Sequence, residues 1–225
     1  MSDIDDLINE AVSVSTSSRH EDLNKKVVEF CQKASDENYW LEKVFSGLAY
    51  RNFHDFLKLK KLIAKNEDDD LPVIAYYSRN LLEVGIWTAF CFQSAENAHI
   101  FYSDVGRDGD DLLKKNLEMG IDKESTITAR AELKQNAAKQ NVHDIEQRFT
   151  SVHKAAKEVG LEKLFLCANK QLSKFAHPTA LQIISPRSGQ EAQDLAKSFY
   201  TQASVQFCQS IYILEIRYGL REQES

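Results

Sequence analysis

Glycine and proline, the residues that most often end regular structure, are scarce in this sequence. Only 8 glycines and 3 prolines occur among 225 residues. A β-sandwich or β-barrel needs many turns, and these two residue types supply a large share of them. Apolar residues recurring at three- and four-residue steps occupy most of the remaining chain, as in amphipathic helices. We therefore predict an all-α fold, a single up-and-down bundle of about seven helices.

Cysteine is also scarce, and its spacing excludes the common cysteine-based sites. Cys31, Cys91, Cys167 and Cys208 lie far apart, with no C-x-x-C pair among them. A disulfide framework or a zinc site requires closely spaced cysteines or a mixture of cysteine and histidine ligands. We interpret the four as reduced core residues of a cytosolic protein, and we expect no metal and no cofactor.

Long apolar runs and an excess of basic charge are both missing. The longest nearly uncharged apolar run, Val84 to Phe92, is far shorter than the roughly 20 residues of a membrane span. The N-terminal residues lack the basic and apolar parts of a secretory signal. The 28 basic and 34 acidic side chains give a net charge of −6, which disfavours a surface devoted to nucleic acid. We expect a soluble, cytoplasmic protein that contacts neither membrane nor DNA.

Familiar nucleotide and hydrolase motifs are absent as well. The sequence has no G-x-x-x-x-G-K-[ST], G-x-G-x-x-G, H-E-x-x-H or G-x-S-x-G. The glycine- and aspartate-rich segment SDVGRDGDD, residues 103–111, is predicted to be a loop. It fails as a calcium loop because Lys115 stands at position twelve, where an EF-hand has its bidentate glutamate. A short helix from Asp110 to Met119, closed by Gly120, is expected to follow.

The chain is organised around one predicted helix, Leu71 to Tyr102. Its first twenty-odd positions are apolar on every face, so it belongs in the middle of a bundle. The last half of the final helix, which runs to about Tyr218, is nearly as apolar, and we expect the two helices to be core neighbours. We interpret residues 1–18 as a mobile leader and residues 19–225 as one helical-bundle domain.

A predominantly polar segment from about Asp122 to Val159 has only a narrow apolar seam, which includes Ala131 and Ala138. An outer helix that packs one edge on a bundle has this pattern. We expect this helix to lie on the outside of the bundle. It is also the predicted contact surface of a homodimer.

Two charges stand one helical turn apart inside the central apolar helix, Arg79 and Glu83. Burying both is costly unless further hydrogen bonds form, so each is expected to have another partner. Asn169, Ser173 and His177 follow at four-residue steps along a later helix that Pro178 ends. We predict a charged cluster of Arg79, Glu83 and His177 in the core, with the helix C-terminus favouring a protonated imidazole.

Two interpretations of this cluster remain open. In the first, it is a structural polar network that fixes the register of the helices. In the second, it is a catalytic site in which Arg79 binds an anion, His177 acts as general acid or base, and Glu83 orients the imidazole.

Three segments carry a resemblance to a known family. YSRNLLE around Arg79, FYSDVGRD, and SKFAHPTAL around His177 resemble the signature segments of an uncharacterised bacterial all-helical domain family. In that family an Arg-x-x-x-Glu helix is followed much later by a His-Pro or His-Ser element. The resemblance spans residues 35–217 and implies a helical fold without implying an activity.

The segment RFTSVH places Arg148 and His153 at R-x4-H spacing. In this respect the chain is similar to the HEPN superfamily, helical bundles of which many are ribonucleases in toxin and phage-defence systems. Those enzymes pair an arginine with a histidine four to six residues later and commonly have a small polar residue after the arginine. Phe149 departs from that pattern. The resemblance implies RNA as a substrate and Arg148 and His153 as an alternative catalytic pair.

The sequence thus leaves two functions from different classes. The main expectation is an interaction or regulatory module that forms a homodimer or binds another protein. The alternative is a HEPN-like ribonuclease or another phosphate-handling enzyme of a bacterial defence or toxin system.

Overall fold

The computed structural model describes residues 18–34, 39–65, 67, 70–139 and 150–222. These residues form nine helices and no strand, so the fold is all-α, with more helices than the predicted seven. The expected leader lies outside the described residues, apart from Ser18, which begins the first described helix. The helices are α2 (Ser18–Lys33), α3 (Tyr39–Lys65), α4 (Leu71–Gln93), α5 (Ala95–Glu118), α6 (Lys123–Lys139), α7 (Val152–Glu158), α8 (Glu162–Ala176), α9 (Ala180–Ile184) and α10 (Gly189–Arg217).

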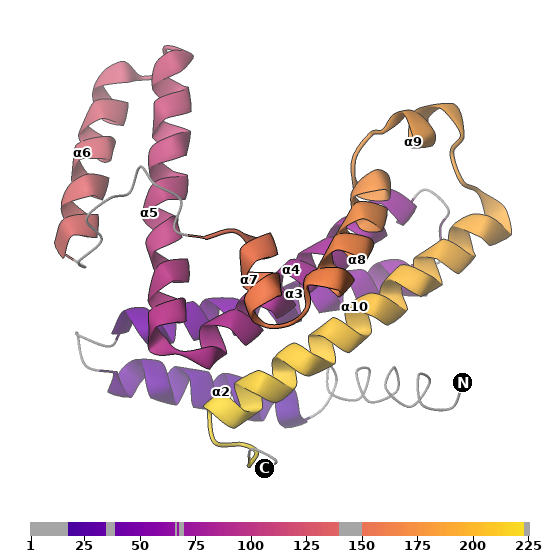
Figure 1. Ribbon diagram of the computed structural model, residues 1–225, viewed down its shortest axis with the longest axis horizontal. Coiled ribbons are helices and arrows are strands. Elements are labelled where there is room, and N and C mark those ends of the chain that lie inside the picture. The colour runs from indigo at the N-terminus through magenta and orange to yellow at the C-terminus, as the bar shows by residue number, and fades with distance from the viewer. Residues whose placement is uncertain (1–17, 35–38, 66, 68–69, 140–149, 223–225) are drawn as a thin grey trace.

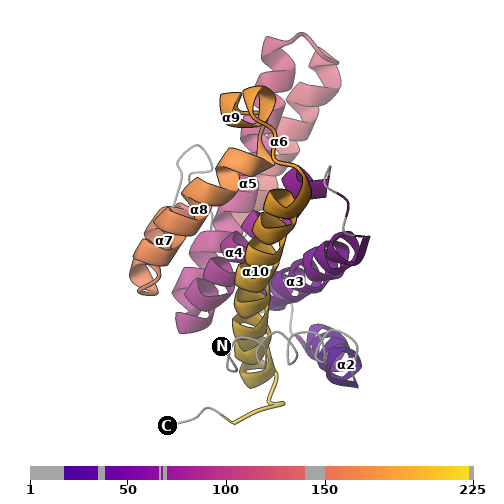
Figure 2. The same cartoon turned by 90° about the vertical axis from the view of Figure 1, so that its right-hand side faces the viewer.

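Helix α4 is the centre of the molecule. The helices α3, α8 and α10 all pack against it, and α10 makes the most extensive contact (Figures 1 and 2). Ala75, Leu81 and Ile86 on α4 have no exposed surface. The prediction that the two most apolar helices are core neighbours is confirmed. We call α3, α4, α7, α8 and α10 the body.

The central helix is shorter than predicted. It ends at Gln93, and Ser94 is extended, with φ −160° and ψ 156°. The hydroxyl of Ser94 accepts a hydrogen bond from the Asn97 N–H at 3.0 Å and so caps α5. Such an N-cap satisfies one of the free N–H groups at the start of a helix. The apolar pattern continues to Tyr102, but the chain changes direction at Ser94.

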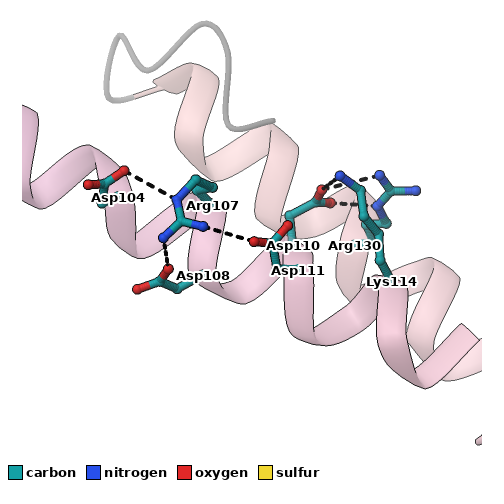
Figure 3. A network of polar contacts seen from close by, with 7 residues as sticks. All are labelled: Asp104, Arg107, Asp108, Asp110, Asp111, Lys114 and Arg130. Carbon is teal, nitrogen blue, oxygen red and sulfur yellow. Dashed lines mark hydrogen bonds and ion pairs between the residues drawn. The ribbon is translucent and has the colours of Figure 1, made fainter. Parts of the chain in front are cut away.

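The predicted loop at residues 103–111 is wrong, because this segment is helical and belongs to α5. Several of its polar side chains bond within the helix: Ser103 donates to the His99 carbonyl at 2.7 Å, and Arg107 contacts three aspartates of the same helix (Figure 3). Gly109 serves close packing instead of a turn. A Cβ there would lie 3.2 Å from a methyl carbon of Leu133 on α6.

Helix α6 folds back along α5 and forms a hairpin that projects from the body, which we call the arm (Figure 1). Gly120, with φ +70°, makes the turn as predicted, and the Ile121 N–H donates to the Asn116 carbonyl at 2.9 Å. Among the described helices, α6 has its only extensive contact with α5.

The outer helix predicted for residues 122–159 is wrong in extent, and its predicted seam packs on the body only at its end, where Ala156 is buried in the core. Helix α6 ends at Lys139, α7 is a separate short helix, and residues 140–149 lie outside the described part of the chain. The predicted seam residues Ala131 and Ala138 are exposed. Leu133 and Ala137 pack together inside the arm instead.

The four cysteines are free, but they are not all core residues as predicted. Cys91 is buried, whereas Cys167 is exposed on α8. Burial raises the pKa of the Cys91 thiol to about 12. No helix in the described residues is both long enough and apolar enough to cross a membrane.

Candidate functional site

The predicted cluster lies where the C-terminal half of α8 passes α4. Helix α8 ends at Ala176, and His177 is extended with φ −117° and ψ 151°, because Pro178 restricts the residue before it. Ser173 and Asn169 lie about one and two turns further back on α8. This arrangement places three polar side chains of α8 along one edge of α4.

Arg79 is the hub of the cluster. Its Nε donates to Asn169 Oδ1 at 2.9 Å, and its Nη1 donates to His177 Nε2 at 3.0 Å. The same Nε lies 3.0 Å from Glu83 Oε1. Ser173 donates its hydroxyl proton to Asn169 Oδ1 at 3.3 Å. Arg79 therefore contacts both Glu83 and His177, although His177 lies nearly a hundred positions later in the sequence. The catalytic role of these residues stays a prediction.

The cluster does not lie in the core, which corrects the expectation from the sequence. The side chains of Arg79 and Glu83 are 29% and 28% exposed, and His177 is exposed. The buried face of α4 runs through Ser78 and Leu82, so Arg79 and Glu83 lie one position further around the helix. Their charges retain water contact, and the desolvation cost expected for a buried pair is correspondingly small.

The contact with Arg79 orients the His177 ring. A guanidinium can only donate hydrogen bonds, so Nε2 of His177 is the acceptor in this contact. The protonated imidazole expected from the sequence stays a prediction. In the part of the chain that the structure describes, Glu83 makes no hydrogen bond to His177 and contacts Arg79 instead. The predicted role of Glu83 in orienting the imidazole is therefore not supported by a direct contact.

The alternative pair, Arg148 and His153, is only half described. Arg148 falls outside the described residues. The ring of His153 is exposed on α7, with Nε2 3.0 Å from Glu162 Oε1 of α8. This contact links α7 to α8, and a joint role of Arg148 and His153 stays a prediction.

The sequence missed a second polar network, which lies in the arm (Figure 3). Asp110 on α5 has no exposed side-chain surface, and its carboxylate lies 2.5 Å from Arg130 Nε and 2.8 Å from Lys114 Nζ. The hydrogen bond from Arg130 lowers the Asp110 pKa to about 2. Residues 103–111 were predicted to be a loop, so the contact of Asp110 with α6 was not expected from the sequence.

Metal ligation and a deep pocket are not features of the predicted cluster. Within the described ranges no group of three histidine, cysteine, aspartate or glutamate side chains is arranged to hold a metal ion. One cavity lies between α8 and α10 and a second lies between α4, α10 and the residues that join α7 to α8, but neither is lined by Arg79, Glu83 or His177. The Arg79 cluster is an open polar contact in which hydrogen bonds from Arg79 hold α8 against α4.

No family model, no curated protein and no solved structure matches this chain. The resemblances to the bacterial helical family and to the HEPN superfamily therefore stay predictions. Function has to follow from the geometry of the body, the arm and the cavities.

Proposed function

We propose that this chain is a non-enzymatic, cytoplasmic interaction module in which the body presents the arm to a second copy of the same chain. In this proposal α3, α4, α8 and α10 act as an up-and-down bundle that positions the arm. The supporting observation is a stripe of large apolar side chains on the outside of α5. Val105, Leu112 and Met119 are 62%, 69% and 63% exposed.

The stripe has the spacing that self-association requires. Seven residues make almost two full turns of a helix, so these three side chains lie on one line along α5. An antiparallel pairing of two α5 helices about a two-fold axis at Leu112 places Val105 of one copy against Met119 of the other. Such an interface uses the same surface on both copies, as closed dimers do. Exposed apolar side chains flanked by charge commonly mark a protein contact.

The charges beside the stripe fit the same pairing. Asp108 and Lys115 flank Leu112, and their side chains are 67% and 69% exposed. The two-fold axis at Leu112 brings Asp108 of one copy close to Lys115 of the other. Opposite charges at the rim of an interface favour the correct register and speed association.

The mass of the particle in solution tests this proposal. Size-exclusion chromatography with light scattering on the full chain should give a dimer for the wild type. Leu112→Glu places a charge at the two-fold axis and should give a monomer with an unchanged circular dichroism spectrum. Leu166→Glu is the matched control, because Leu166 is 50% exposed on α8 in the body. A monomeric wild type, or a dimer that survives Leu112→Glu, contradicts the proposal.

A charge reversal tests the register. Asp108→Lys and Lys115→Asp each place like charges together across the axis, and each should weaken the dimer several-fold. The double variant restores opposite charges and should recover dimerisation. If the double variant dimerises no better than the single variants, the antiparallel register is wrong even where a dimer forms.

One observation favours a second candidate, an RNA-cleaving enzyme. Arg79 Nη1 lies 3.0 Å from Nε2 of His177, and the imidazole is exposed, so a phosphate has access to an arginine and a histidine together. Such a phosphate must compete with Glu83 for Arg79. Cleavage of a quenched fluorescent RNA by the wild type, and its loss in His177→Ala at unchanged thermal stability, would establish this candidate. The interaction proposal predicts equal, background rates for both proteins.

A further inference from the structure

Helices α8 and α10 both pack on α4 without extensive contact between each other, and a groove runs between them. A cavity of about 240 Å³ lies in this groove, lined by residues of α4, α8 and α10. A second cavity, of about 460 Å³, lies beside it between α4, α10 and the residues that join α7 to α8. Gln206 and Gln209 of α10 line both cavities. Ligand sites in proteins commonly have volumes of about 300–1,000 Å³, so the cavity in the groove has room for a small organic molecule only.

Small residues on α4 leave the groove open. Gly85 and Ala89 line the larger cavity, and Ser78 lines the smaller one. A Cβ on Gly85 would lie 3.2 Å from both Gln206 Oε1 and Ser210 Oγ, so only glycine allows α10 to approach here without displacement. Gly85 therefore sets the close approach of α4 and α10 beside the larger cavity.

Two residues beside the smaller cavity each have a buried polar atom without a hydrogen-bond partner. Ser78 is 1% exposed, and its hydroxyl makes no hydrogen bond. Gln202 Oε1 is also buried and also makes none. Both residues line this cavity. An unsatisfied buried polar group costs about 1–3 kcal/mol. Two such groups beside one cavity are explained if a bound molecule supplies the missing hydrogen bonds.

Ser78 differs in this respect from other buried serines in the described helices. Ser103, Ser204 and Ser210 each donate to the carbonyl four residues earlier, at 2.7, 2.8 and 2.8 Å. This local bond is the usual solution for a serine inside a helix. Ser78 lines the cavity and its buried hydroxyl does not make this bond, so the hydroxyl has a hydrogen bond left to form.

The lining indicates the chemical class of the ligand. Leu82 and Leu172 provide apolar walls, and a volume of about 240 Å³ is too small for a turn of helix, whose diameter is about 10 Å. Among the described residues, no charged side chain lines this cavity. Arg221 is the charged residue among those described around the larger cavity, and it pairs with Glu215 at 2.6 Å. A charged ligand would lose its hydration without compensation.

We infer that the groove between α8 and α10 binds a small, neutral organic molecule with an apolar body and one hydroxyl or amide group. The polar group bonds to the Ser78 hydroxyl and to the side-chain amide of Gln202. The apolar part lies against Leu82 and Leu172. This site is separate from the arm and does not depend on dimerisation.

Isothermal titration of the full chain with 1-naphthol and with decan-1-ol tests the site, and naphthalene is the probe without a hydroxyl. At least one alcohol should bind the wild type. Ser78→Ala and Gln202→Leu should each weaken alcohol binding about tenfold, which is the loss of about 1.4 kcal/mol of hydrogen bonding. Both variants should leave naphthalene binding nearly unchanged, because the apolar walls remain.

Two further variants keep the test decisive. Ala168→Phe fills the smaller cavity and should abolish binding of every probe. Ser204→Ala removes a buried serine hydroxyl that is already satisfied, and alcohol binding should be unchanged. Ser78→Ala removes an unpartnered group, so it should fold with a Tm at least equal to that of the wild type. The inference is overturned if neither alcohol binds the wild type, or if Ser78→Ala and Gln202→Leu both bind alcohols as tightly as the wild type does.

Discussion

Three phenylalanines with no exposed surface fill the centre of the body, whereas one buried carboxylate ties the two helices of the arm together. Phe56 and Phe207 stack with their ring centroids 4.0 Å apart, and Phe199 lies beside them in the same core. In the arm the apolar contact is small, and Asp110 joins α5 to Arg130 of α6. Apolar packing is insensitive to salt and pH, but an ion pair depends on both. We therefore expect the arm to open or rearrange while the body stays folded.

The largest effect is expected in the body. Phe207→Ala removes a fully buried ring between α3 and α10 and should lower the free energy of unfolding by about 3–5 kcal/mol. Urea unfolding followed by circular dichroism measures this loss. Tyr50→Ala, at a side chain that is 69% exposed, is the control and should cost less than about 0.5 kcal/mol. Equal losses for the two variants would show that the body is not held by this core.

A smaller and more local effect is expected in the arm. Asp110→Asn removes the buried charge that holds Arg130 and Lys114, and it should weaken the arm by about 1–3 kcal/mol. Faster hydrogen exchange should be confined to α6 and the second half of α5. Glu191→Gln is the control, because Glu191 is 59% exposed in its ion pair with Arg187 and an exposed ion pair contributes little. Faster exchange throughout the body after Asp110→Asn would mean that arm and body unfold as one unit.

Acid should loosen the arm before it affects the body core. The Asp110 pKa falls from 3.8 to about 2 on folding, so its charge stabilises the arm fully above about pH 4. That stabilisation is lost as the pH falls toward 2, because the carboxylate is then protonated. Amide NMR signals of α6 should change over this range in the wild type. Asp110→Asn has no carboxyl to titrate and should show a smaller change, whereas identical titrations would exclude this role of Asp110.

The smallest effect is an expected absence of change at Cys91. Because burial raises the pKa of the Cys91 thiol to about 12, a thiol reagent should label exposed Cys167 first and Cys91 only when the body opens. Labelling of Cys91, followed by mass spectrometry, should be no faster in Asp110→Asn than in the wild type. Phe207→Ala should accelerate it. Faster Cys91 labelling in Asp110→Asn would remove the distinction between the two regions.

Much of the fold could be predicted from the sequence. Local signals were sufficient for the end of α8 before Pro178 and for the turn at Gly120. The four-residue steps of Asn169 and His177 correctly placed both side chains on the edge that meets Arg79. In each case one helix face or one backbone restriction decided the outcome.

The errors arose where tertiary contacts decided the structure. Glycine in residues 103–111 was interpreted as a turn signal, but Gly109 instead allows Leu133 of α6 to approach α5. The break at Ser94 lies inside a continuing apolar pattern, and only its N-cap marks it. The unpartnered Ser78 hydroxyl could not be predicted either, because it depends on the distance between α8 and α10 above α4.

The concentration dependence of hydrogen exchange tests the central claim, that the arm is the surface on which two copies meet. Exchange should be measured by mass spectrometry on the wild type at low and high protein concentration. The account predicts that peptides around Leu112 gain protection at high concentration while peptides of α8 do not change. Equal exchange of the Leu112 peptides at both concentrations, or a gain confined to the body, would contradict it.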